Sequence, residues 1–109
     1  MPKFISNYVV LTDGKVLHNH IVITDDSGLM KEIVPFDTEL AYTRFVPNPI
    51  LICSHAEAEA VKTTFDCCKS LNEFCDSIAL KHYPALQKGM PMSVLELDFE
   101  HRFINELQG

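Results

Sequence analysis

Short apolar runs separated by turn residues fill the first half of the chain. KFISNYVVL is followed by Thr12-Asp13-Gly14-Lys15, and IVIT is followed by the four-residue stretch DDSG. Both stretches are typical of turns between consecutive strands, because glycine accepts a positive φ and aspartate bonds its own backbone. A third strand is expected near residues 29–35, and ELAYTRFV and ILICS supply further extended segments. The pattern predicts an amino-terminal β meander.

The spacing of apolar residues becomes helical after the segment ILICS. Two Ser-x-x-Glu pairs, at 54–57 and 70–73, are typical of helix capping boxes. Each pair precedes apolar residues that recur at intervals of three or four, which places them on one helical face. We therefore expect two central helices, over about 55–68 and 70–83.

A strand pattern returns near the carboxyl end. In MSVLELDF, apolar residues alternate with Glu96 and Asp98, which favours a strand near 92–99 with one buried face. The following segment, EHRFINELQG, carries apolar residues at spacings that suit a short terminal helix.

The order of these segments predicts an α+β fold. We expect the amino-terminal meander to be joined by the late strand near 92–99, with the two helices packed on one face of the sheet. The chain has 109 residues, 47% of them hydrophobic, which suits one compact core. A single domain over residues 1–109 is therefore expected.

The charge balance excludes several classes of partner. Nine Lys and Arg against fifteen Asp and Glu give a net charge of -6, so phosphate backbones and anionic membrane surfaces would be repelled. No apolar run approaches the roughly 18 residues of a membrane span, and no secretion signal is present at the amino end. These observations predict a cytoplasmic protein that binds neither nucleic acid nor membrane.

Candidate metal ligands gather in the stretch PNPILICSHAE. Cys53 and His55 share one face if the strand continues through them, and Glu57 or Glu59 could add an oxygen ligand. A zinc site normally needs about four ligands, or three plus water. The alternative interpretation is a buried Cys53 and a His55 at the start of a helix, and both interpretations stay open.

Other reactive residues form no recognisable catalytic motif. His18 and His20 share a strand face, but no third ligand lies nearby, and a solvent-facing hairpin explains them. The four cysteines show no paired CxxC spacing and, with no secretion signal, are expected to stay reduced and serve as small core hydrophobes. The chain contains neither a Gly-x-Ser-x-Gly elbow nor a glycine-rich phosphate loop.

The stretch PNPILICSHAE resembles a signature of metal-dependent amidohydrolases, in their cytosine deaminase and chlorohydrolase-like branch. In that family, a small β domain ends in Pro-Gly-x-x-(Asn/Asp)-x-His-x-His, which enters a catalytic barrel and supplies the first metal ligands. Pro47 and His55 match the signature, whereas Asn48 replaces the glycine, Leu51 the amide or acid, and Cys53 the first histidine. The ligand pair of the family is therefore not intact.

The two ends of the chain resemble the two parts of the family's composite β domain. YVVLTDGKVLHNHIVITDDSGLMKEIVP is similar to its opening strands, and SLNEFCDSIALKHYPALQKGMPMSVLELDF to its closing helix, Lys-Gly turn and last strand. Only about a dozen residues separate these parts, far fewer than the roughly 200 of a catalytic barrel. The resemblance implies a composite β domain that lacks the barrel.

Two functions follow as hypotheses from this resemblance. The first is a non-catalytic interaction or assembly module without a cofactor, whose exposed apolar face is covered by a second copy in a homodimer or by another protein partner. The second is a small metal-binding or metal-assisted hydrolytic protein that holds zinc through Cys53, His55 and Glu57.

Overall fold

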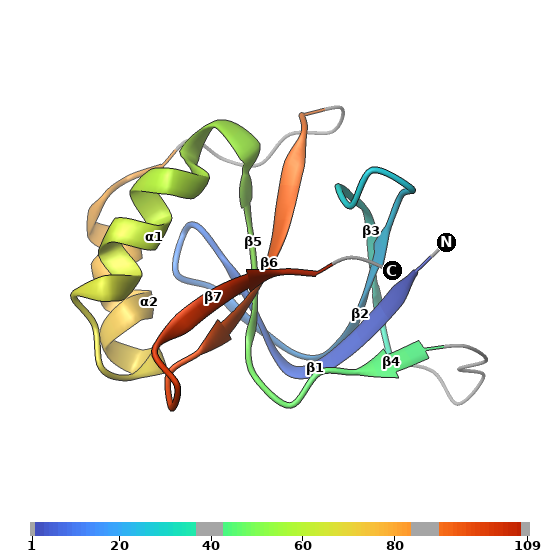
Figure 1. The fold of residues 1–109 in the computed structure, drawn as a ribbon, viewed down its shortest axis with the longest axis horizontal. Coiled ribbons are helices and arrows are strands. Elements are labelled where there is room, and N and C mark those ends of the chain that lie inside the picture. Colours follow the sequence, from blue (N-terminus) through green and yellow to red (C-terminus); the bar gives the residue numbers. More distant parts are fainter. Residues whose placement is uncertain (1, 37–42, 84–89, 108–109) are drawn as a thin grey trace.

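A computed structural model of the chain describes residues 2–36, 43–83 and 90–107 (Figure 1). It confirms the α+β prediction, because its described part contains seven strands, two α-helices and one turn of 3₁₀ helix. In chain order these elements are β1 (Lys3–Leu11), β2 (Val16–Thr24), β3 (Met30–Pro35), β4 (Thr43–Phe45), β5 (Ile50–Ser54), η1 (His55–Glu57), α1 (Ala58–Asp66), α2 (Leu71–Leu80), β6 (Met92–Asp98) and β7 (Phe103–Glu106).

The first three strands form the predicted meander of antiparallel hairpins. In the first turn, Asp13 Oδ1 accepts the Lys15 amide at 2.8 Å, and Gly14 has a φ of +89°. In the second turn, Asp25 Oδ1 accepts the amides of Ser27 at 2.8 Å and of Leu29 at 3.1 Å. The turns therefore form for the local reasons that the sequence indicates.

The late strand joins the first half of the chain, as expected. The sheet order is β3-β2-β1-β5-β6-β7, and β4 pairs with β1 beside this path. β5 runs parallel to β1, and β6 runs antiparallel to β5, with Cys53 opposite Ser93. The two ends of the sequence thus meet in one sheet.

The sheet curls until its two halves approach each other. Leu29, just before β3, forms an isolated antiparallel bridge with Ser93 of β6, although the sheet path places three strands between them. The side chains alternate along β5, so that Ile50 and Ile52 lie on the concave side and Leu51 and Cys53 on the other. We call the buried residues on the concave side the concave cluster: Phe4, Val9, Val22, Val46, Ile50, Ile52, Met92, Val94 and Leu107.

Both α-helices pack on the other face of the sheet, as predicted, and lie together on one side of the molecule (Figure 1). Phe65 of α1 and Phe74 of α2 are buried there with Leu51, Cys53 and other apolar residues of the sheet. The predicted capping box of α2 is present, since the Glu73 amide donates to Ser70 Oγ at 3.2 Å. These contacts bury the apolar stripe of each helix.

Two local predictions are wrong. Ser54 does not cap a helix through its side chain, because it is still paired with Met92 as the last residue of β5. The tail does not form a helix over its described residues, because it folds back as β7 against β6. So short a helix would be marginal by itself, whereas the edge of β6 supplies hydrogen-bond partners for the same backbone.

None of the helices in the described part of the chain is long and apolar enough to cross a membrane.

Candidate functional site

Cys53 lies in the core, with an exposed fraction of 0%, among the residues that join α1 and α2 to the sheet. The pKa of its thiol is raised to about 12, mainly by burial and also by the nearby Glu57 carboxylate, while Lys62 acts in the opposite direction. The thiol is therefore protonated at neutral pH. Metals bind the thiolate form, so this environment does not favour Cys53 as a ligand.

His55 is exposed and contacts a residue that the sequence analysis did not single out. Its Nδ1 lies 2.8 Å from the hydroxyl oxygen of Ser93, in a hydrogen bond between η1 and the buried start of β6. Ser93 comes from the opposite end of the sequence and is brought here by the pairing of β5 with β6. The bond involves Nδ1 and leaves Nε2 as the ring nitrogen that a metal ion could bind.

The cavity beside His55 and Ser93 is small. Its volume is about 50 Å³, and Glu106 of β7 also lines it. Ligand pockets usually measure about 300–1,000 Å³, so this cavity has room for little more than water. A histidine and a serine in contact can act as base and nucleophile, but the cavity beside this pair is smaller than the usual ligand pocket.

Glu57 lies at the end of η1, half-buried, and its Oε2 atom is buried with no hydrogen-bond partner in the described structure. Its carboxylate is close enough to raise the pKa of Cys53, whereas His55 bonds Ser93 instead. Across residues 2–36, 43–83 and 90–107, no group of three or more His, Cys, Asp and Glu side chains could hold a metal ion. The assignment of Cys53, His55 and Glu57 as zinc ligands stays a prediction.

All four cysteines are free. Cys68 is buried like Cys53, which agrees with their expected use as core hydrophobes, but Cys75 is only half-buried and Cys67 is exposed. Burial also raises the pKa of the Cys75 thiol, with a further contribution from Asp76.

Asp98 and His101 form an ion pair in the turn between β6 and β7. Asp98 Oδ1 accepts the His101 amide at 2.9 Å, and Oδ2 lies 3.0 Å from His101 Nδ1. The hydrogen bond from the His101 backbone amide is the main cause that lowers the pKa of Asp98. The hydrogen bond between the two side chains is the main cause that raises the pKa of His101. Each group therefore favours the charged form of the other.

This pair predicts a pH window for stability. The lowered pKa of Asp98 stabilises the fold above the usual carboxyl range, near pH 4, and this contribution is lost as the pH falls through the lowered value. The raised pKa of His101 stabilises the fold below about pH 6.5, and this contribution is lost as the pH rises through the raised value. In urea unfolding, Asp98→Asn should therefore lose most stability relative to wild type between about pH 4 and 6.5.

The control for this prediction is His101→Gln, which keeps the Asp98 bond to the backbone amide. The unfolding free energy of this variant should no longer fall as the pH rises through the raised pKa of His101. It should keep most of its fall at acid pH, where Asp98 becomes protonated. Unfolding free energies of Asp98→Asn and wild type that differ by the same amount at every pH would contradict the assignment.

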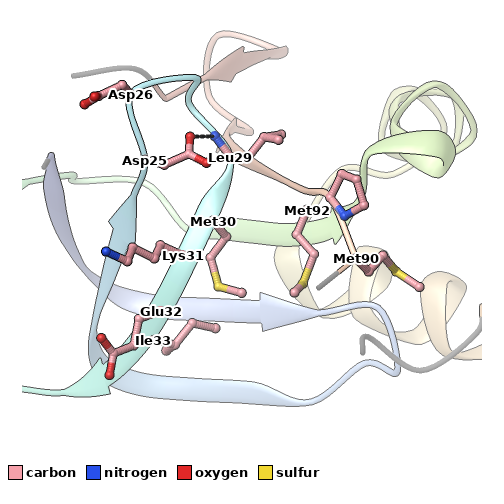
Figure 2. Close-up of a pocket in the computed structure, with 10 residues that line it drawn as sticks. Asp25, Asp26, Leu29, Met30, Lys31, Glu32, Ile33, Met90 and Met92 are labelled. Atoms are coloured by element: carbon pink, nitrogen blue, oxygen red, sulfur yellow. Dashed lines mark hydrogen bonds between the residues drawn. The ribbon is translucent and has the colours of Figure 1, made fainter. Parts of the chain in front are cut away.

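An open groove lies between β3 and the start of β6, and Figure 2 shows the side chains that line it. Its volume is about 930 Å³. We call it the methionine groove, because three of the four methionines of the chain line it. Its apolar lining consists of Leu29, Met30, Ile33, Met90, Pro91 and Met92, and its charged lining of Asp25, Asp26, Lys31 and Glu32.

The apolar side chains of the groove continue the core. Met30 and Ile33 of β3 pack against the concave cluster, to which Met92 belongs. Figure 2 shows Met30 and Met92 extending into the space between the two strands, whereas Lys31 and Glu32 point to the opposite side of β3. The groove is therefore apolar inside and charged at its rim.

This groove could not be predicted from the sequence, since its two walls are far apart in the chain. The one local signal is Met90-Pro91-Met92, which places two flexible apolar side chains around a residue without an amide donor.

No protein-family model, curated protein or solved structure matches this chain.

Proposed function

We propose that this protein is a non-catalytic interaction or assembly module that binds a partner protein through the methionine groove. The groove itself is the observation that carries the proposal. An apolar surface with a charged rim is typical of protein interaction sites. Methionine side chains are unbranched and flexible, so they adapt to the shape of a partner.

The chemistry around the predicted ligands supports the non-catalytic part of the proposal. Cys53 is buried and protonated, and it lies in the core rather than in a cleft. His55 and Ser93 border a cavity of about 50 Å³, which is smaller than the usual ligand pocket. These residues are better explained as parts of the fold.

The proposal includes descent from an amidohydrolase-like ancestor by loss of the catalytic barrel. Its support is the direct pairing of β6 with β5, which joins the segments that resemble the opening and closing parts of the family's small β domain. The strand β5 and the turn η1 lead into α1, in the place where the resemblance would put a barrel. Cys53 then stands where the ancestor had a histidine ligand.

A different protein is a better partner than a second copy. The lining of the groove carries three carboxylates and one amino group, and the net charge of the chain is -6. Two such surfaces would repel each other, whereas a basic partner would be attracted.

Peptide display on the immobilised protein tests this function. Peptides selected on the wild type are expected to bind Met30→Glu at least about tenfold more weakly, because the substitution places a charge inside the apolar groove. The matched control is Leu80→Glu, which changes another apolar residue at a site that is 76% exposed and lies at the end of α2. Circular dichroism shows whether both variants are folded.

Three outcomes would overturn the proposal. They are a selection that yields no binding peptide, peptides that bind folded Met30→Glu as tightly as the wild type, and turnover of amide, amidine or chloro-substituted compounds by the purified protein. Elemental analysis of untagged protein tests the alternative. Stoichiometric zinc that is lost in a Cys53→Ala, His55→Ala variant would favour the metal-binding function.

A further inference from the structure

The methionine groove lies at a seam of the curled sheet. At one end of the seam, Leu29 and Ser93 form the bridge that brings the two halves of the sheet together. Past this bridge, no pairing joins β3 to β6 in the described part of the chain, and the groove occupies the space between them. The groove therefore lies where one more strand would complete the pairing of the sheet.

The backbone of β3 is oriented to accept such a strand. The Phe36 amide donates to the Asn19 carbonyl at 2.9 Å, which sets the alternation of the β2–β3 ladder. In an antiparallel ladder, successive residues point alternately toward and away from the partner strand. Val34 therefore faces β2, and the amide and carbonyl of Ile33 face the outer edge. Within the residues that the structure describes, no strand pairs with that edge at Ile33.

The side chains around this edge specify the chemistry of the added strand. Met30, Ile33 and Met92 present an apolar floor that alternate side chains of a strand can cover. Asp26 is exposed in the turn beside Asp25, and Glu32 is exposed next to Lys31 on the side of β3 away from the groove, where the alternate side chains of an added strand would lie. These carboxylates attract lysine and arginine, and they repel a second copy of this acidic chain.

We propose that the methionine groove binds an extended segment of another protein as an added β-strand paired with β3 at Ile33. The segment has apolar residues on the side that faces the groove and lysine or arginine on the alternate positions. The backbone hydrogen bonds supply affinity, and the alternating side chains supply specificity. This inference rests on the proposed function, because it names the kind of partner that the groove accepts.

A short synthetic peptide in which lysine alternates with valine is the probe, and the same peptide with glutamate in place of lysine is its control. The full chain should bind the lysine peptide at least about tenfold more tightly than the glutamate peptide, by fluorescence anisotropy. Added salt should weaken the binding, since the rim is exposed. Amide hydrogen exchange at Ile33 should slow when the lysine peptide is bound, because that amide gains a partner.

A lysine peptide methylated on the backbone nitrogens that face β3 separates strand pairing from burial of side chains. It should lose binding, whereas methylation of the alternate nitrogens should not. Equal binding of the lysine and glutamate peptides, unchanged exchange at Ile33, or equal binding of the two methylated peptides would overturn the inference. Absence of binding by the lysine peptide would also overturn it. If the inference fails in one of these ways but display-selected peptides still require Met30, the proposed function stands. If those peptides do not require Met30, both the proposed function and the inference fail.

Discussion

Replacing Phe74 with alanine is expected to lower the free energy of unfolding by about 3–5 kcal/mol. The ring is fully buried between α2 and the sheet, and it meets two other rings edge-on. The ring centroids of Phe74 and Phe65 are 6.0 Å apart at 78°, and those of Phe74 and Phe99 are 6.1 Å apart at 68°. Truncation would remove both contacts and leave a cavity that the sheet and α1 cannot close. Domains of this size are commonly stable by about 5–15 kcal/mol, so the expected loss is a large part of the total.

Urea unfolding followed by circular dichroism measures this loss, with Leu80→Ala as the control on the same helix. Leu80 is 76% exposed, so its truncation should change the unfolding free energy by less than about 0.5 kcal/mol. A loss below about 1 kcal/mol for Phe74→Ala would mean that α2 does not pack on the sheet as described.

The elements set by local chemistry could be predicted from the sequence. Asp13 and Gly14 form the first hairpin turn, as expected of a residue that bonds the next backbone amides followed by one that accepts a positive φ. Ser70 caps α2 through the predicted bond to the Glu73 amide. In these cases, the residues that determine the structure lie within four positions of one another.

The elements that depend on distant partners were predicted less well. The tail has apolar residues at helical spacing, but Leu107 donates its amide to the Val94 carbonyl in continuation of the β6–β7 ladder. Arg102 adds a second distant contact, since its guanidinium donates to the carbonyls of Cys68 and Asp66 and lies over the ring of Phe65. These contacts stabilise the strand hairpin, and the spacing of residues in the tail does not reveal them.

In the candidate site, too, contacts between distant residues were not predicted from the sequence. Proximity in the sequence suggested Cys53 and His55 as a pair, but the last residues of β5 and the following turn direct them to different partners. Ser93, which bonds His55, and Met92, which lines the methionine groove, come from β6. The pairing of β5 with β6 brings them here, and the start of β6 also forms one wall of the methionine groove.

The two faces of the sheet therefore have different roles. The helices bury one face around Phe65 and Phe74, and the curled sheet buries most of the other around the concave cluster. The concave cluster is extended by Met30 and Ile33 to the methionine groove, where the sheet is not closed. A partner bound at the groove would thus contact side chains that belong to the core itself, which makes binding sensitive to how the sheet curls.

Replacing Gly14 with valine is the second substitution for which we expect a large effect. Gly14 has a φ of +89°, and a Cβ atom there would lie 3.0 Å from Ala79 Cβ and 3.2 Å from the Cys75 carbonyl oxygen. The left-handed backbone costs a β-branched residue about 1–2 kcal/mol, and overpacking against α2 costs about 1–3 kcal/mol more. Urea unfolding should therefore show a loss of about 2–5 kcal/mol.

The control is Gly28→Val, since Gly28 has a φ of +85° in the turn between β2 and β3. It should lose about 1–2 kcal/mol through the backbone alone. The difference between the two variants measures the contact between the first hairpin turn and α2, which involves two adjacent turns of that helix. Equal losses in both variants would show that this contact is absent, and that the aromatic cluster around Phe74 and the sheet alone position α2.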